Sequence, residues 1–339
     1  MLLERLFQEA VARGASDIHL SPFSPPIVRV NTRLQNLNHD ILAPEDTIAM
    51  AQKILGRERF AAVEEEGEVD TSYKMWETGN FRINIYRHQG LWAIACRVIN
   101  TLIPSAEYLG LPPIVPSLAR YSAGLILITG PTGSGKSTTM AALINEINQE
   151  RACHIVTLED PIEYIHTNNK SLITQREIGR DSMSFHNALR SALRQDPDVI
   201  MIGEMRDLET VSTAITAAET GHLVLATLHT ITAPQTIERI IDIFPPYQQQ
   251  QVRIQLANSL RAVICQRLLP RKGDERMVVA CEIMICTTAI RNLIREGKIH
   301  QIQNAMHTGS KFGMLTMENA LQQLIDQGLI ESHFIREAK

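Results

Sequence analysis

The pattern of apolar and polar residues changes about a third of the way along the chain. In residues 80–87 and 91–99 apolar and polar side chains alternate, which predicts half-buried antiparallel strands. Shorter runs at 16–20, 25–31 and 69–75 predict three further strands, and amphipathic segments predict helices at 2–13, 44–55 and 57–66. Residues 1–100 are therefore predicted to form a small α+β domain, a sheet with a helical face.

From residue 124 onward, apolar runs without alternation follow one another between helical segments. Strands are predicted at 125–130, 154–160, 199–204 and 222–230, and helices at 134–148, 184–195, 208–221 and 234–244. Apolar strands joined by helices are typical of a parallel sheet that is covered on both faces, so we assign residues 118–286 to an α/β core. Residues 287–339 predict short amphipathic helices, and the four prolines of 101–117 predict an interdomain linker and hinge.

Composition narrows the class of protein without identifying it. The 339 residues suffice for two domains, and 44% hydrophobic with 21% charged residues is ordinary for a globular protein. A net charge of −4 gives no sign of nucleic-acid binding. The five cysteines form no CxxC pair, which disfavours a zinc knuckle. No apolar run could span a bilayer, and Glu4 and Glu9 argue against a signal peptide, so a cytoplasmic protein is expected.

Residues 130–138 carry the strongest chemical signal in the chain. They follow an apolar strand, precede a helix and fit the nucleotide-binding pattern G-x-x-x-x-G-K-[ST]. Glycines free the backbone N–H groups for phosphate oxygens, the lysine reaches the β- and γ-phosphates, and the serine hydroxyl can reach magnesium. The predicted nucleotide-binding residues are Gly130, Pro131, Thr132, Gly133, Ser134, Gly135, Lys136, Ser137 and Thr138.

Carboxylates and a histidine follow neighbouring strands at the same predicted sheet edge. Glu163 belongs to an acidic cluster after the second core strand, where a carboxylate can deprotonate an attacking water. The next strand ends in Gly203 and Glu204 rather than in the usual aspartate of a magnesium site. His229 ends the fourth strand, whereas His222 begins it and would act only through the preceding turn or across a subunit boundary.

Four motifs in this order resemble those of a known family. They are GPTGSGKSTT at 130–139, TLEDPIEY at 157–164, DPDVIMIGEMRD at 196–207 and AAETGHLVLATLHT at 217–230. They are similar to the phosphate loop, aspartate box, atypical Walker B motif and histidine box of the secretion and pilus ATPases of bacteria, which form hexameric rings. GASDIHL at 14–20 and AIRNLIREGKIHQ at 289–301 extend the likeness over nearly the whole chain. The latter resembles the C-terminal signature of type IV pilus retraction ATPases.

The resemblance implies a PAS-like N-terminal domain and a RecA-like P-loop domain, with ATP and Mg²⁺ at subunit boundaries. The resemblance makes Glu163 the expected general base. Glu204 and Ser137 are expected to organise magnesium, and Glu204 is expected to do so through water. Arg82 and Arg97 match two arginines that reach the phosphates from a neighbouring subunit, although on sequence alone they are typical of a solvated sheet face. Further candidates for stabilising charge or for pairing between subunits are Arg190, Arg194 and Arg206.

The function implied is a homohexameric ATPase that powers pilus retraction and twitching motility. Its expected partners are an inner-membrane platform protein and the assembly ATPase, which would hold it peripherally at the cytoplasmic face of the membrane, without nucleic acid. Assembly ATPases carry an additional N-terminal domain and a four-cysteine zinc insertion, so an extension role is disfavoured. An accessory retraction paralogue, a type II/IV secretion or conjugation ATPase, a RecA-like DNA translocase and a non-hydrolysing adaptor remain alternatives.

Overall fold

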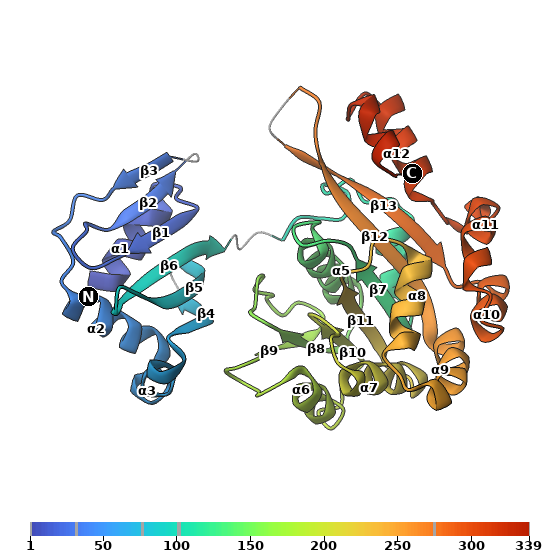
Figure 1. Cartoon of the computed structure of the whole chain (residues 1–339), viewed down its shortest axis with the longest axis horizontal. Helices are drawn as coiled ribbons and strands as arrows, with labels where there is room; N and C mark the ends of the chain where they lie inside the picture. Colours follow the sequence, from blue (N-terminus) through green and yellow to red (C-terminus); the bar gives the residue numbers. More distant parts are fainter. Residues whose placement is uncertain (1, 31–32, 76–77, 100–102, 274–275, 339) are drawn as a thin grey trace. The chain divides into compact units, whose positions relative to one another are not determined.

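The chain forms two compact units, each with its own sheet and core (Figure 1). The structure, a computed structural model, describes residues 2–30, 33–75, 78–99, 103–273 and 276–338. We call residues 1–102 together with 161–165 the N-terminal unit, and residues 103–160 together with 166–339 the C-terminal unit. Residues 100–102, where the first predicted domain ends and the predicted linker begins, lie outside the described residues.

The N-terminal unit contains a six-stranded antiparallel sheet in the order β3-β2-β1-β6-β5-β4. The strands are β1 (Asp17–Leu20), β2 (Ile27–Val30), β3 (Arg33–Asn36), β4 (Glu68–Met75), β5 (Gly79–His88) and β6 (Leu91–Ile99). Every strand predicted in this region is present. The additional strand β3 has four exposed residues, so no alternation of apolar and polar side chains marks it in the sequence.

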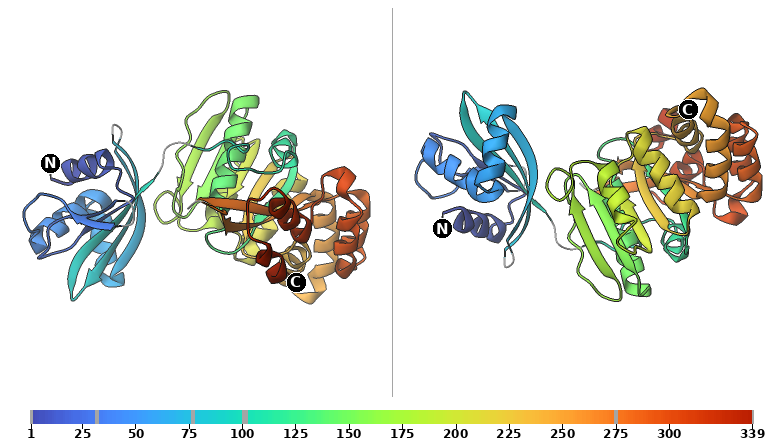
Figure 2. Two further views of the ribbon diagram at one scale, coloured as in Figure 1. Left: turned by 90° about the horizontal axis from the view of Figure 1, so that it is seen from above. Right: turned by 90° about the horizontal axis from the view of Figure 1, so that it is seen from below.

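Three helices cover one face of this sheet (Figures 1 and 2). They are α1 (Leu2–Ala12), α2 (Pro44–Leu55) and α3 (Arg57–Glu66). Alternate strand residues such as Ile18, Phe81 and Ile83 pack against the apolar sides of these helices in one hydrophobic cluster. The period of two therefore leaves the polar residues of the same strands on the other face of the sheet.

The C-terminal unit contains a seven-stranded sheet in the order β13-β12-β7-β11-β10-β8-β9. Its strands are β7 (Gly124–Thr129), β8 (His154–Glu159), β9 (Leu172–Glu177), β10 (Val199–Ile202), β11 (Leu223–Leu228), β12 (Leu260–Pro270) and β13 (Met277–Ile285). The four predicted strands β7, β8, β10 and β11 run parallel as predicted, and so do the unpredicted strands β9 and β12. Strand β13 runs antiparallel to β12. An antiparallel edge strand of this kind is common in α/β sheets.

Helices pack on both faces of the second sheet, which explains its non-alternating apolar strands. Leu125 and Leu127 of β7 lie in one cluster with α6 to α11, whereas Ile126 and Ile128 lie in another with α5. None of the described helices is long and apolar enough to cross a membrane. The helices are α4 (Ile114–Ser117), α5 (Lys136–Glu150), α6 (Phe185–Ala192), α7 (Leu208–Glu219), α8 (Ala233–Asp242), α9 (Pro246–Ser259), α10 (Thr288–Arg295), α11 (Ile302–His307) and α12 (Met317–Asp326).

Two regions of the C-terminal unit differ from what the sequence pattern predicts. No element is predicted between residues 245 and 285, where the structure has α9, β12 and β13. Helix α9 contains a run of four glutamines and buries few apolar side chains, so it lacks an apolar stripe. The final predicted helix, at 333–339, is a 3-10 helix over Ser332–Ala338.

The proline-rich segment packs onto the C-terminal unit. Ala106, Leu111 and Val115 are buried in the same cluster as Ile126 and Ile128 of β7. From residue 103 onward this segment therefore contributes to the core of the C-terminal unit and borders the cavity described below.

A buried carboxylate on β13 ties two helix starts together. Glu282 is 1% exposed, and its Oε1 accepts a hydrogen bond of 2.8 Å from Ala233 N, the first residue of α8. Its Oε2 accepts one of 3.4 Å from Met317 N, the first residue of α12. Burial raises the pKa of Glu282, although these N–H groups act in the opposite direction. The carboxylate thus supplies partners that helix starts cannot supply themselves.

Replacing Glu282 should destabilise the C-terminal unit. Glu282→Ala leaves two buried N–H groups without their acceptor, so we expect the free energy of unfolding to fall by about 2–4 kcal/mol. Chemical denaturation measures this change. The control Glu238→Ala, which removes an exposed carboxylate from α8, should change it by less than about 0.5 kcal/mol. Equal stability of the two variants would show that the buried caps contribute nothing.

Candidate nucleotide site

The loop from Gly130 to Gly135 joins β7 to the start of α5. Gly133 and Gly135 have φ values of +79° and +88°, which L side chains rarely adopt. A Cβ on Gly130 would lie 2.4 Å from the carbonyl oxygen of Gln266, so only glycine fits there. These conformations wrap the loop around the N-terminal end of α5, where free N–H groups favour an anion.

Lys136 lies across this loop. Its Nζ donates to the carbonyl oxygens of Gly130, at 2.8 Å, and Pro131, at 2.9 Å. The ammonium is therefore held beside the loop backbone that would surround a phosphate. Of the other predicted residues, Ser137 is exposed and Thr138 half-buried.

A cavity of about 490 Å³ opens beside the loop within the C-terminal unit. Its polar end is formed by loop and α5 residues, and the rest of its wall is largely apolar. That wall comes from the proline-rich segment and from the β12–β13 hairpin, with Tyr108, Leu109, Leu111, Leu268, Met277 and Val279. A largely apolar pocket next to a phosphate loop fits the base and ribose of a nucleotide. The sequence pattern did not reveal this wall, because its residues belong to a segment interpreted as a linker and to two unpredicted strands.

Two buried polar atoms at this cavity lack a partner among the described residues. They are Ser134 Oγ and Gln266 Oε1. Gln266 is 1% exposed, and its Nε2 donates to Thr139 Oγ1 at 2.8 Å, which fixes the direction of its amide. Since buried polar groups are normally hydrogen-bonded, these atoms fit a site that is completed by a polar ligand.

Glu204 lies two residues after the end of β10 and is held from two sides. Arg206 Nη2 is 2.7 Å from its Oε2, and His229 Nε2 is 3.0 Å from its Oε1. Burial raises the pKa of Glu204, but the hydrogen bonds and charges of Arg206 and His229 outweigh it, so the pKa lies below its ordinary value. The carboxylate is therefore ionised at neutral pH, as a group that organises a metal-bound water must be.

Gly203 has a reason for being glycine that its position in the sequence does not reveal. Its N–H donates to Leu158 O at 2.7 Å, and a Cβ would lie 3.1 Å from the same oxygen. The close neighbour is thus the end of strand β8. The pairing of β10 with β8 ends at Ile202, so the carboxylate of Glu204 lies two residues beyond the strand end.

A second carboxylate at this edge, Glu159, belongs to the same predicted acidic cluster as Glu163. It ends β8, is buried, and its Oε1 accepts hydrogen bonds from Thr157 Oγ1 at 2.7 Å and Gln175 Nε2 at 3.0 Å. Gln175 lies on β9, a strand that the sequence pattern does not predict. The pairing of Glu159 with that strand therefore could not be foreseen.

The two predicted histidines lie at opposite ends of β11. His229 contacts Glu204, as described above. His222 precedes Leu223, which pairs with Gly124 at the start of β7, and its Nδ1 is 3.0 Å from Ala217 O at the end of α7. The strand separates His222 from the phosphate-loop edge by roughly 17 Å. Within this unit the structure does not bring His222 to the loop, and its role across a subunit boundary stays a prediction.

The metal predicted at this site would need the nucleotide as a ligand. Among the described residues, no group of three or more His, Cys, Asp or Glu side chains could hold a metal ion. Mg²⁺ commonly keeps several waters and binds few protein groups in addition to phosphate oxygens. The Ser137 hydroxyl at the start of α5 and the Glu204 carboxylate at the same sheet edge fit this mode of binding.

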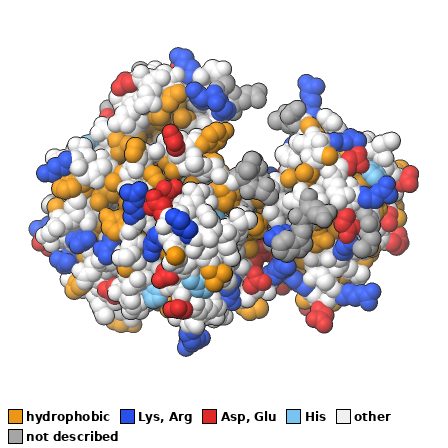
Figure 3. All heavy atoms as spheres, turned by 180° about the vertical axis from the view of Figure 1, so that it is seen from behind, with side chains coloured by type: hydrophobic (Ala, Val, Ile, Leu, Met, Phe, Trp, Pro, Cys, Tyr) orange, Lys and Arg blue, Asp and Glu red, His pale blue; other side chains and the backbone are white. Residues whose placement is uncertain are grey.

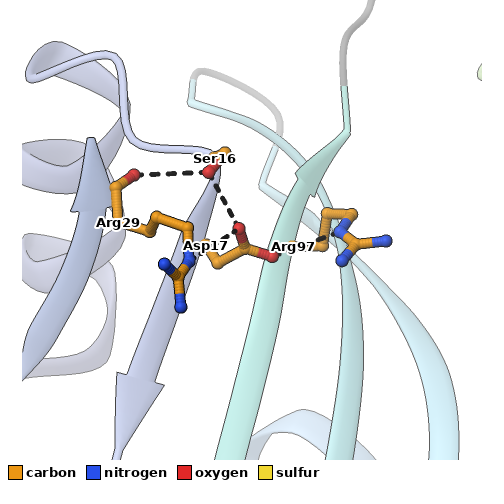
Figure 4. A network of polar contacts seen from close by, with 4 residues as sticks. All are labelled: Ser16, Asp17, Arg29 and Arg97. Atoms are coloured by element: carbon orange, nitrogen blue, oxygen red, sulfur yellow. Dashed lines mark hydrogen bonds and ion pairs between the residues drawn. The ribbon is translucent and has the colours of Figure 1, made fainter. Parts of the chain in front are cut away.

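The N-terminal unit brings Arg82 and Arg97 side by side. Arg82 on β5 and Arg97 on β6 are directly opposite each other in the sheet register. They lie on the polar face, away from the helices. The Nε of Arg97 donates to Asp17 Oδ1 of β1 at 3.2 Å, and Arg29 of β2 lies on the other side of Asp17 (Figure 4). Like charges directly opposite one another are unfavourable, so this arrangement favours a bound anion.

Glu163 is grouped with the N-terminal unit and lies near one of these arginines. Its Oε1 is 3.7 Å from Arg82 Nη1, and both side chains are substantially exposed. The predicted base and one predicted arginine therefore form an ion pair. Of the further candidates, Arg206 binds Glu204, whereas Arg190 and Arg194 are exposed at the C-terminal end of α6.

Comparison with known proteins identifies the family. Residues 113–337 match the family of type II/IV secretion system proteins. The type IV pilus retraction ATPase PilT of Pseudomonas aeruginosa is 43% identical over 337 residues, 99% of this chain and 98% of that protein. The type IV pilus ATPase PilU of the same organism is 38% identical over 330 residues, 97% of this chain and 86% of that protein. A crystal structure of the pilus retraction motor PilT with bound ADP matches with a TM-score of 0.91 at 49% identity, covering 99% of this chain and 96% of that one. This chain therefore belongs to the family of type II/IV secretion system proteins.

Proposed function

We propose that this chain is an ATP-hydrolysing motor that powers the retraction of type IV pili. The observation that carries the proposal is the meeting of the phosphate loop, Glu204 and His229 at one sheet edge. The chain that carries this site is similar over its full length to a retraction ATPase, and a solved relative holds ADP.

In this proposal the C-terminal unit binds ATP. The loop N–H groups and Lys136 hold the phosphates, and the cavity beside the loop takes the base. Ser137 and the ionised Glu204, the latter through water, would hold Mg²⁺, which would supply positive charge beside the phosphates. Glu163 acts as the general base, and His229 keeps Glu204 oriented toward the γ-phosphate.

The arginines complete the site from a neighbouring subunit. Arg82 and Arg97 stabilise charge on the γ-phosphate of a nucleotide whose loop belongs to the next copy of the chain. A head-to-tail contact of this type closes into a ring, for which we propose a homohexamer. In this proposal the orientation of the two units changes when a subunit boundary closes. ATP hydrolysis is thereby coupled to movement.

The proposed cellular setting follows the likeness to pilus ATPases. The motor works at the cytoplasmic face of the bacterial inner membrane, on a platform protein of the pilus, and alternates with the assembly ATPase. Membrane association is peripheral and depends on those partners.

Two related functions rank below this proposal. An accessory retraction paralogue stays an alternative, because the chain is also 38% identical to a second type IV pilus ATPase, PilU, against 43% for PilT. A secretion or conjugation ATPase would share the whole nucleotide site. The segment 289–301, with Ile290 and Ile294 buried on α10 and Asn292 and Arg295 exposed, favours retraction because it resembles the retraction signature.

A DNA translocase and a non-hydrolysing adaptor are less well supported. On the face drawn in Figure 3, basic and acidic side chains are interspersed, without the continuous basic stripe that binds a nucleic-acid backbone. Stimulation of turnover by DNA would favour the translocase. An adaptor that does not hydrolyse ATP would not need an ionised Glu204 held by two partners. Binding of ATP without phosphate release is the result that would favour an adaptor.

Removing either Lys136 or Glu204 should abolish turnover. We expect Lys136→Ala and Glu204→Ala to lower phosphate release at least about a hundredfold, because each loses a charge that acts on the phosphates or on the metal shell. Folding is checked by circular dichroism and gel filtration. The control Glu238→Ala should retain wild-type turnover, and undiminished phosphate release in Glu204→Ala would overturn the site assignment.

Loss of the gene separates retraction from the other pilus functions. A deletion strain should carry more surface pili than the parent and should not twitch, because pili are still assembled but not withdrawn. Electron microscopy and a subsurface motility assay measure the two properties. Cells without pili would indicate an assembly role, and normal twitching would indicate an accessory paralogue or another secretion system.

A further inference from the structure

We propose that Asp17 is a positioning residue for Arg97. The Asp17 carboxylate accepts a hydrogen bond from Nε of the guanidinium. This contact directs the two Nη groups away from the sheet, toward a phosphate. This inference rests on the proposed function, because it requires that Arg97 meets the nucleotide of a neighbouring subunit.

The sheet register places Asp17 between two arginines. Asp17 on β1 is directly opposite Arg29 on β2 and directly opposite Arg97 on β6. Arg82 is in turn directly opposite Arg97 on β5. Four charged residues therefore form one row across four adjacent strands, with a single carboxylate among three arginines. The backbone hydrogen bonds of the sheet fix the spacing of this row.

The contact between Asp17 and Arg97 uses only one of the donor atoms of the guanidinium. The Nε atom is 3.2 Å from Asp17 Oδ1, and this is the only hydrogen bond or ion pair that Arg97 makes with described residues. Both Nη groups are left for a ligand, and Figure 4 shows the guanidinium beyond Nε turned away from Asp17. Two Nη groups side by side match two oxygens of a phosphate.

Asp17 itself is held more firmly than the arginine it contacts. Its side chain is 20% exposed, against 70% for Arg97. The second oxygen, Oδ2, accepts a hydrogen bond of 2.8 Å from Ser16 Oγ and lies 3.9 Å from Arg29 Nε. Partial burial raises the pKa of Asp17, but the hydrogen bonds from Ser16 and Arg97 outweigh it and the pKa is lowered. A fixed, ionised carboxylate thus limits the conformations of a long exposed side chain.

We expect the contact with Asp17 to favour phosphate binding because it limits the conformations of the Arg97 side chain before the phosphate arrives. An exposed arginine loses side-chain entropy when it is fixed. Asp17 removes part of that cost in advance and also separates Arg29 from Arg97. A surface ion pair that only stabilised the sheet would contribute little to folding stability and nothing to turnover.

A double-mutant cycle on the full-length protein tests the inference. The variants are Asp17→Asn, Arg97→Ala and the two combined, and the readouts are kcat and KM for ATP together with the melting temperature. We expect Asp17→Asn to lower kcat about tenfold with KM little changed, because positioning matters most in the transition state. In the Arg97→Ala background Asp17→Asn should have no further effect on kcat.

The control variant is Asp70→Asn on the same sheet. Asp70 is exposed on β4, shares the polar face of the sheet with Asp17 and accepts a hydrogen bond from Asn84 at 3.2 Å. Its replacement removes one negative charge from that face without removing a contact to Arg97, so kcat should stay at the wild-type value. Asp17→Glu keeps the carboxylate and should restore part of the lost activity if Asp17→Asn proves poorly folded.

Failure of the inference and failure of the proposed function are distinguishable. If Arg97→Ala has full activity, the arginine has no role at the phosphate, and the proposed function loses this part. If Arg97→Ala is defective but Asp17→Asn retains wild-type kcat, or lowers kcat equally in both backgrounds, Asp17 does not act through Arg97 and only the inference is overturned.

Discussion

The parallel register of β7, β8, β10 and β11 is the constraint on which the nucleotide site depends. It aligns the carboxyl ends of four strands at one edge, where the phosphate loop, Glu159, Glu204 and His229 follow. Because the strands are buried on both faces, a shift of one register step would be costly, so the positions of these groups are fixed by packing. Within this frame the carboxylate lies beyond the strand instead of the usual aspartate at its end. Gly203 fits closely against Leu158 of β8, and the carboxylate is supplied at the next residue.

Elements with a strong local pattern could be predicted from the sequence. The alternating strands β5 and β6, the apolar strands from β7 to β11 except β9, and the phosphate loop all lie where the pattern places them. Elements that depend on tertiary contacts rather than on a local pattern could not be predicted from the sequence. Strand β3 is exposed, α9 is rich in glutamine, and the cavity wall joins Tyr108 to a hairpin about 160 residues further along the chain. The pairing of Glu204 with His229 depends on β10 and β11 being neighbours in the sheet, which periodicity does not give.

Charge is distributed differently in the two units, in a way that suits a site shared between subunits. The C-terminal unit pairs its cations at the site internally, Arg206 with Glu204 and Lys136 with loop carbonyls. The N-terminal unit instead keeps three arginines in one row with one aspartate, and leaves both Nη groups of Arg97 exposed. In the proposed ring, a phosphate of a neighbouring subunit is the partner that such an array fits, and Asp17 would prepare the array for that contact. Under this proposal hydrolysis depends on closing the boundary between subunits, which couples ATP turnover to movement of the subunits.

Mixing two inactive variants tests this shared site most directly. Lys136→Ala subunits keep their arginines and Arg97→Ala subunits keep their phosphate loop, so a mixed ring contains some boundaries with both parts intact. When the two are co-expressed and purified together, phosphate release should rise toward about a quarter of the wild-type rate, because that fraction of boundaries is intact at random mixing of head-to-tail contacts. A mixture no more active than the two variants measured separately would contradict the account.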